Sequence, residues 1–316
     1  MDFINNFSQF STLFQQIING LSLGSVYALI AVGYSLVYSI LSFSNFAHGG
    51  FLVVGGYICY GLLTMESIAV GGFLFNIPSF VNNIWLSGLF ALLGAGFVAV
   101  ITERLAYKPI RERTPNTLYL LIASMGVSIV IENIFVIVVG GRFRALPQGT
   151  FPSTPFTFGN VTVNASDVLS LVFAVVFLGG LQFFLRKTRW GLAIRAAACD
   201  LRTAGLMGVN TSFLIGIVFF VAGLLAAVGG IFLSARYTLY PQLGGITTKA
   251  FVAAVIGGLG SLPGAVVGSL ILGLAEMLTA GFISSQMRDL VVFSMLVIVL
   301  LVKPDGFFGK HVGDKI

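Results

Sequence analysis

The chain has 316 residues, of which 57% are hydrophobic and only 9% are charged. A soluble domain carries charge at about a quarter of its positions, so this composition excludes an ordinary soluble protein and predicts one polytopic membrane domain in a lipid bilayer. The net charge of +6 does not indicate nucleic-acid binding, because the basic residues gather in two inter-span loops and the C-terminal tail, as in cytoplasmic segments.

Apolar runs that are long enough to cross about 30 Å of hydrocarbon recur along the whole sequence. The candidate runs are residues 15–40, 46–65, 84–102, 117–139, 166–186, 212–235, 264–283 and 288–302. A shorter run, 246–260, is either a re-entrant half-helix or a broken crossing. We therefore expect residues 1–316 to form an all-α, polytopic helical bundle with eight or nine membrane segments, including broken or re-entrant helices.

The first two runs are separated by a polar, glycine-closed break, Asn45-Phe46-Ala47-His48-Gly49-Gly50. Polar groups at membrane depth are costly unless they face a cavity or protein, so Asn45 and His48 are candidates for the translocation pathway. Asn45 suits the N-cap of a helix that begins near residue 46, and the positive end of such a half-helix attracts carboxylate or carbonyl groups. His48 is either a proton-relay group or, as we favour, a structural residue at the irregular backbone.

Two acidic residues lie inside later apolar runs, Glu132 and Glu276. Each is expected to face the interior of the bundle, because an ionised side chain is expensive in contact with lipid. Either the two acids contact substrate or a proton, or they form hydrogen bonds between helices. We favour the second interpretation and keep both residues as pathway candidates.

Glycines at four-residue spacing predict close helix packing at membrane depth. The three pairs are Gly20-x-x-x-Gly24, Gly260-x-x-x-Gly264 and Gly264-x-x-x-Gly268. Small residues at this spacing let two helix backbones approach each other.

The basic segments predict the orientation. One cluster follows residue 102, a second follows residue 185, and the tail holds Lys303, Lys310 and Lys315. If all three are cytoplasmic, residues 246–260 must cross as a broken fourth segment after residue 211, and the N-terminus must lie outside.

Residues 187–210, the second basic segment, have the pattern of a short amphipathic helix. Arg195 and Arg202 lie on one face, and Gly205 and Gly208 end the pattern. The apolar positions are Ile194, Ala197, Leu201 and Ala204. Such a helix either lies on the membrane surface or docks on a cytoplasmic partner.

Motifs for catalysis are absent from the sequence. No phosphate-binding loop, nucleophile elbow or pair of histidines at metal spacing occurs. The two cysteines, Cys59 and Cys199, lie in unlike surroundings and are not expected to pair. We therefore expect this chain to have no catalytic residue, no metal site and no cofactor of its own.

Four motifs in order resemble the LivH-type permease subunit of branched-chain amino-acid ABC importers. They are residues 19–29 (NGLSLGSVYAL), residues 45–49 (NFAHG), residues 254–265 (AVIGGLGSLPGA) and Pro304-x-Gly306-x-x-Gly309. The resemblance implies an importer in the bacterial inner membrane. Its implied partners are a LivM-like second permease subunit, two cytoplasmic ATPase subunits that hold ATP and Mg²⁺, and an extracytoplasmic substrate-binding protein.

Within residues 187–210, the resemblance further implies a cytoplasmic coupling loop that docks on an ATPase. The coupling candidates are Arg195, Ala197, Asp200, Arg202, Ala204 and Gly208.

Substrate and energy source are separate questions. The related permeases import branched-chain amino acids, other amino acids, amides or urea, so the substrate stays open at this point. The rival interpretation is a proton-coupled secondary transporter of small polar solutes, with His48, Glu132 and Glu276 as the relay. We disfavour it because few charges line the spans.

Overall fold

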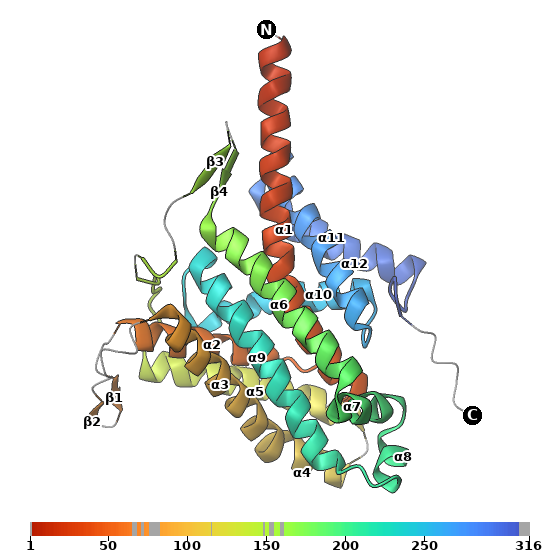
Figure 1. Cartoon of the computed structure of the whole chain (residues 1–316). Coiled ribbons are helices and arrows are strands. Elements are labelled where there is room, and N and C mark those ends of the chain that lie inside the picture. The colour runs from red at the N-terminus through yellow and green to blue at the C-terminus, as the bar shows by residue number, and fades with distance from the viewer. Residues whose placement is uncertain are drawn as a thin grey trace.

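The described part of the chain folds into a helical bundle with two short β-hairpins at its edge (Figure 1). The computed structural model describes residues 2–64, 68–70, 73–75, 83–114, 116–147, 149–151, 155–158 and 161–309. The helices are α1 (Asp2–Leu41), α2 (His48–Thr64), α3 (Ile84–Thr102), the π-helix η2 (Glu103–Tyr107), α4 (Lys108–Arg113), α5 (Thr117–Val138), α6 (Ala165–Lys187), α7 (Arg189–Cys199), α8 (Leu201–Leu206), α9 (Thr211–Tyr237), η3 (Pro241–Ile246), α10 (Thr247–Gly257), α11 (Leu262–Phe282), η4 (Ser285–Met287) and α12 (Arg288–Val302). The antiparallel hairpins are β1 (Ile68–Val70) with β2 (Phe73–Phe75) and β3 (Phe156–Phe158) with β4 (Val161–Val163).

Seven helical stretches in the described residues are long and apolar enough to cross a membrane. In the described residues one shorter apolar helix, α2, brings the number to eight, and the 11-residue helix α10 brings it to nine if it is counted as well. The prediction of an all-α polytopic bundle is confirmed, with the two small hairpins as an unpredicted addition.

The helices divide into an inner and an outer group. α1 and α9 are mostly buried, whereas α5 and α12 are mostly exposed. α1 packs against α11, α9, α6 and α10, and it runs through the middle of the bundle in Figure 1. The outer helices are apolar on their exposed faces, as lipid requires.

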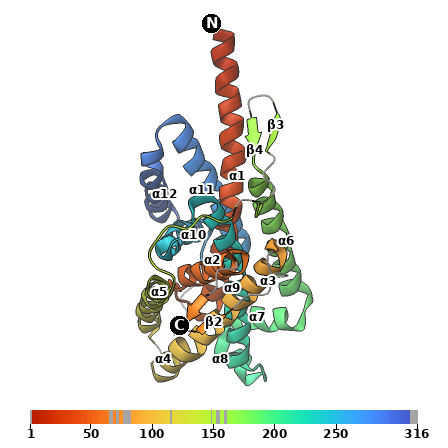
Figure 2. The same ribbon diagram turned by 90° about the vertical axis from the view of Figure 1, so that its left-hand side faces the viewer.

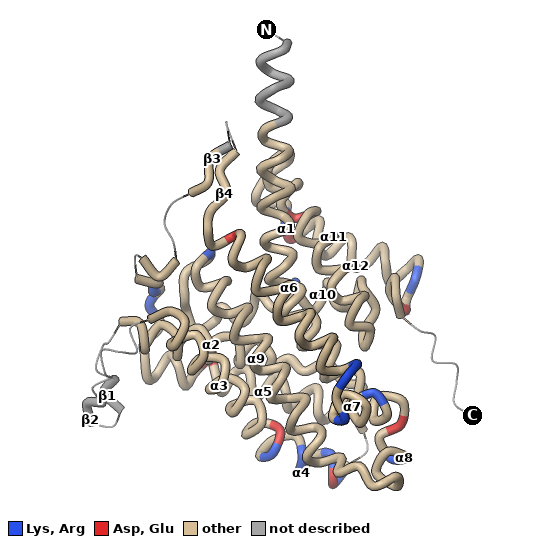
Figure 3. The backbone as a smooth tube through the Cα atoms, viewed as in Figure 1, with Lys and Arg blue, Asp and Glu red and all other residues tan. Residues whose placement is uncertain are grey.

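Charge gathers at one end of the bundle. Figure 3 shows most Lys, Arg, Asp and Glu residues around α4, α7 and α8, and Figure 2 places the N-terminus and the β3–β4 hairpin at the opposite end. By the positive-inside rule we expect the α7–α8 end to be cytoplasmic and the N-terminus external; the structure shows that the two lie at opposite ends of the bundle. Lys310 and Lys315 of the basic tail lie outside the described residues.

The basic segment after residue 102 is helical, not an inter-span loop as predicted. The π-helix η2 and α4 carry the third span on to Arg113. Glu103 explains the continuation, because its side chain is fully buried and lies 3.5 Å from Arg104 Nε and 3.1 Å from Arg111 Nη2. A buried carboxylate requires such partners, and a helical turn brings them within reach.

Close glycine packing joins α11 to α1 and α10. A Cβ at Gly273 would lie 2.5 Å from both Cα and N of Gly24, and 2.6 Å from the carbonyl oxygen of Gly20. On the other face, Gly264 and Gly268 meet the backbone of Gly257. Two of the three predicted pairs therefore pack helices together.

The third pair is different because Gly260 lies in a turn. Gly258 and Gly260 have φ values of +104° and +84°, a conformation that favours glycine, and they reverse the chain between α10 and α11. The C-terminal segment covers this turn. Phe307 N–H donates to Ile256 O and Phe308 N–H to Gly257 O, both at 2.9 Å. Gly260 lies next to Ser39 in the last turn of α1. The C-terminal segment, which covers the Gly258–Gly260 turn, therefore lies at the same end of the bundle as the last turn of α1.

Candidate functional site

The polar break lies between α1 and α2, and Asn45 organises it. The Oδ1 atom of Asn45 accepts hydrogen bonds from Ala47 N at 3.2 Å and from the hydroxyl of Tyr107 at 2.8 Å. The backbone of Phe46 donates to Ser124 Oγ at 3.1 Å. Asn45 thus holds the start of α2, which begins at His48, and ties it to the third span.

His48 is fully enclosed by protein in this conformation. Its ring centroid is 4.6 Å from that of Tyr34 and 6.3 Å from that of Phe51. On the α1 side the ring lies against Gly33, where a Cβ would be 2.5 Å from the Cε1 atom of His48. The missing side chain at residue 33 provides the space for the imidazole. This setting favours the structural interpretation of His48 over the relay.

The first turn of α10 connects this region to Glu276. The hydroxyl oxygens of Tyr34 and Thr247 are 3.2 Å apart, and Thr247 lies two residues before Lys249. The Lys249 Nζ atom is 2.8 Å from Glu276 Oε1 and 2.7 Å from Asp289 Oδ1.

Glu276 itself is almost completely buried, and the hydroxyl of Tyr27 donates to its Oε2 atom at 3.0 Å. The group joins α1, α10, α11 and α12, so Glu276 is the centre of an ion pair between helices. The lysine that neutralises it stands at the start of the 246–260 run, and sequence reasoning missed that partner.

Glu132 does not join the other three candidates. Its side chain is half-buried on α5, and Ser128 Oγ donates to its Oε1 atom at 3.3 Å. The neighbouring Ile131 faces inward against Gly50, which turns Glu132 away from the centre of the bundle. The expectation that Glu132 faces the interior is therefore met only in part.

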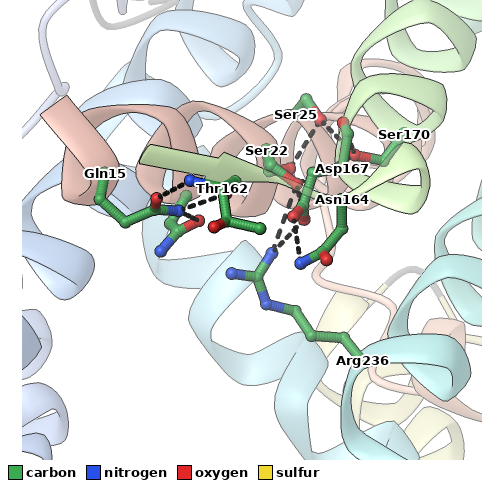
Figure 4. A network of polar contacts seen from close by, with 9 residues as sticks. Gln15, Ser22, Ser25, Thr162, Asn164, Asp167, Ser170 and Arg236 are labelled. Carbon is green, nitrogen blue, oxygen red and sulfur yellow. Dashed lines mark hydrogen bonds and ion pairs between the residues drawn. The ribbon is translucent and has the colours of Figure 1, made fainter. Parts of the chain in front are cut away.

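A polar network that the sequence analysis did not single out joins the middle of α1 to the first turn of α6 and the last turn of α9 (Figure 4). Asp167 is at its centre. Its Oδ1 atom accepts from Ser22 Oγ at 2.7 Å and from Arg236 Nη1 at 3.3 Å, and its Oδ2 atom accepts from Asn164 Nδ2 at 3.3 Å. Ser170 Oγ lies 3.1 Å from Ser22 Oγ.

This network borders a cavity of about 310 Å³. Its polar wall holds Asp167 and Arg236, whose side chains are 14% and 24% exposed. Its apolar wall holds Val26, Phe232 and Leu233. Two residues could have indicated this network from the sequence. Ser22 lies inside the first motif of the family resemblance, and Arg236 is a lone cation directly after the apolar run 212–235.

At the charged end of the bundle, the 187–210 segment forms two helices, α7 and α8. Asp200 caps α8, and its Oδ1 atom accepts from the backbone N–H groups of Arg202 at 2.9 Å and Thr203 at 3.2 Å. Gly208 ends α8 with a φ of +90°, and its N–H donates to Gly205 O. A cap at the start and a left-handed glycine at the end define this short helix.

The coupling candidates fall into two groups. Ala197 and Ala204 are buried within the chain's own core, whereas Arg195, Asp200, Arg202 and Gly208 are exposed. The tip of α8 also exposes two large apolar side chains, Leu206 and Met207, each 82% exposed. The sequence analysis omitted these two, although they are the apolar residues next to the Gly208 turn.

Similarity to known proteins covers nearly the whole chain. A family model described as "Branched-chain amino acid transport system / permease component" matches residues 16–300. The chain is 37% identical to "High-affinity branched-chain amino acid transport system permease protein LivH" of Escherichia coli K12, over 98% of the chain and 99% of that protein. It is also 37% identical to the corresponding protein BraD of Pseudomonas aeruginosa, over 96% and 97%. A solved structure, PsaBC from Streptococcus pneumoniae in complex with Fab, aligns with 97% of both chains at 12% identity and a TM-score of 0.45.

Proposed function

Because the chain belongs to the family of branched-chain amino acid transport permease components, we propose that it moves branched-chain or related amino acids into the cytoplasm as one permease subunit of an ATP-binding-cassette importer. It is a multi-pass protein of the bacterial inner membrane. The observation that carries the proposal is the identity of 37% to a named permease along nearly the full length of both proteins.

The proposed complex contains further chains. A LivM-like permease pairs with this subunit, two cytoplasmic ATPase subunits bind ATP and Mg²⁺ and supply the energy, and an extracytoplasmic binding protein delivers the solute. No ATP is hydrolysed on the permease itself. The absence of a phosphate-binding loop from this sequence supports that division of labour.

The rival proposal, a proton-coupled transporter, has less support from the geometry. His48 is enclosed by aromatic side chains and Glu276 is already paired with Lys249. Glu132 lies apart from both on α5. A relay requires groups that a proton can reach in sequence, and these three do not form one.

Uptake by the reconstituted complex distinguishes the two proposals. We expect proteoliposomes that hold both permeases and both ATPases to accumulate labelled leucine only when ATP and the binding protein are supplied. A Walker-lysine variant of the ATPases is the matched control and should show no uptake. Leucine uptake by this chain alone, driven by a proton gradient, would contradict the importer proposal.

We further propose that the exposed face of α7 and α8 docks on an ATPase. The exposed Leu206 and Met207 side chains would enter an apolar cleft, and Arg195 and Arg202 would meet acidic groups at its rim. Ala197 and Ala204 would position the helices from the core side. Closure of the ATPases would then push on α6 and α9, which precede and follow this segment in the chain.

Replacing Gly208 by valine should uncouple ATP hydrolysis from uptake. A β-branched residue at a φ of +90° costs about 1–2 kcal/mol and changes the turn that sets the angle of α8. We expect ATPase activity of the assembled complex to persist while uptake falls about tenfold or more, a change that corresponds to about 1.4 kcal/mol. Charge reversal at Arg195 and Arg202 should have the same effect.

Two controls belong to this experiment. Gly205→Ala lies on the same helix without a positive φ and should leave uptake nearly unchanged. Arg142→Glu reverses an exposed charge at the external end and should not uncouple. Normal uptake by Gly208→Val and by the arginine reversals would remove the coupling assignment.

A further inference from the structure

The cavity between α1, α6 and α9 has two unlike walls. One carries the Arg236 guanidinium and the Asp167 carboxylate, whose Nη1 and Oδ1 atoms are 3.3 Å apart. The apolar part of the lining comes from Ala235, which is exposed, and from Val26 and Phe232, which are 3% and 7% exposed, whereas Leu233 is fully buried behind it. Most of the surface that lines this cavity is polar. Small-molecule sites hold convergent polar groups, and their volumes start at about 300 Å³. The observed volume of about 310 Å³ lies at this lower end.

The charges of this cavity balance. One cation and one anion stand side by side, and both side chains are largely withdrawn from solvent. A site of zero net charge, in which a cation lies beside an anion, favours a zwitterion over an ion of either sign, because each pole of the ligand meets its opposite and no net charge is buried.

Both charged groups retain capacity for a ligand. Within the described residues, the contacts of Arg236 use only its Nη1 atom, which leaves the Nη2 and Nε donors for a carboxylate in the paired geometry that guanidinium prefers. In the part of the chain that the structure describes, the Oδ2 atom of Asp167 has one contact, a 3.3 Å hydrogen bond from the exposed Asn164. An ammonium group can replace or join that bond.

We propose that this cavity is a substrate subsite of the permease that takes a zwitterionic aliphatic amino acid. Arg236 binds the α-carboxylate, Asp167 binds the α-ammonium, and the hydrocarbon side chain packs on Ala235 and on the exposed edges of Val26 and Phe232. The proposal rests on the importer function and adds to it a site in the permease itself. Because the cavity lies at the external end of the bundle, it receives the amino acid before the solute passes the break at Asn45.

Direct binding to the assembled complex tests the site. The complex of both permeases and both ATPases is placed in nanodiscs without the binding protein, and binding of labelled leucine is measured. We expect Arg236→Gln and Asp167→Asn to weaken binding at least about tenfold, because each removes a charge-assisted hydrogen bond. Arg142→Gln, an exposed arginine at the same end, should bind like the wild type.

Ligand analogues separate recognition from a purely structural ion pair. Isoamylamine lacks the carboxylate and 4-methylpentanoate lacks the ammonium, so the wild-type site should reject both. The Arg236→Gln variant no longer recognises the carboxylate, so it should no longer discriminate leucine from isoamylamine. The Asp167→Asn variant no longer recognises the ammonium, so it should no longer discriminate leucine from 4-methylpentanoate. Ala235→Leu fills the cavity from an exposed position without changing the ion pair, and it should weaken leucine binding even when the fold is intact.

The outcomes also separate this proposal from the importer function. If the wild-type complex imports leucine with ATP while all three pocket variants keep normal binding and selectivity, Asp167 and Arg236 only brace the helices and the subsite is refuted. If the wild-type complex imports no amino acid, the importer function itself fails. Loss of the predicted analogue discrimination together with the effect of Ala235→Leu would establish the subsite.

Discussion

Replacing Gly273 by valine should separate α11 from α1 and unfold this side of the bundle. A Cβ at residue 273 would lie 2.5 Å from the backbone of Gly24 and 2.6 Å from that of Gly20. Backbone atoms cannot rotate away as a side chain can, so the helices themselves must move. Overpacking of a tight core costs about 3 kcal/mol at the upper end of its usual range, and we expect at least that loss here. Thermal unfolding of the purified chain in detergent measures it.

Gly126→Val is the matched control for this substitution. Gly126 lies inside α5, and a Cβ there would meet nothing within 4 Å. Both variants place the same β-branched residue in a membrane helix, so the difference between them reports the contact between α1 and α11. Equal melting temperatures for the two variants would contradict the proposed packing.

Glu276→Ala should destabilise the protein by about 3–5 kcal/mol, the usual cost of removing one partner from a buried ion pair. The substitution leaves the Tyr27 hydroxyl without its acceptor and leaves Lys249 with only Asp289. Because Lys249 stands in the first turn of α10, this broken helix should lose its anchor. Hydrogen exchange of the α10 backbone should increase along with the loss of thermal stability.

Asp289→Asn provides the comparison, because it alters the second of the two carboxylates that pair with Lys249. Asp289 is 67% exposed, and ion pairs in contact with water contribute about 1 kcal/mol or less. The loss of stability caused by Glu276→Gln should lie between those of Glu276→Ala and Asp289→Asn, because the amide oxygen of glutamine still accepts hydrogen bonds. A loss for Glu276→Ala no greater than that for Asp289→Asn would show that the buried pair does not hold α10.

Much of the fold was predictable from local patterns. The expected run 166–186 became Ala165–Lys187, and the run 212–235 became Thr211–Tyr237. The break at Asn45 is real, and α2 begins at His48. These features follow from hydropathy, caps and glycines, each of which acts within a few residues. The end of the third span was missed because a buried Glu103 keeps the helix going beyond the first basic residue.

The polar contacts were much less predictable. Glu132 and Glu276 both read as single acids in apolar runs, yet the first is half-buried on an outer helix and the second is buried against Lys249. A hydropathy pattern reports how apolar a helix is, but the direction of each face depends on which neighbours it packs against. The same limit hid Arg236 and Asp167, which are separated by 69 residues and meet only when α6 and α9 lie together.

The sequence by itself determined the membrane class, the spans and the polar break, and it predicts the orientation, because hydrophobic burial and the placement of positive charge are properties of short segments. Only the tertiary structure decided which polar groups meet. Those meetings depend on how closely the helix backbones approach one another, and that distance is set by glycine contacts such as Gly24 with Gly273. The packing of α1 against α6 and α9 places Ser22, Asp167 and Arg236 around one cavity.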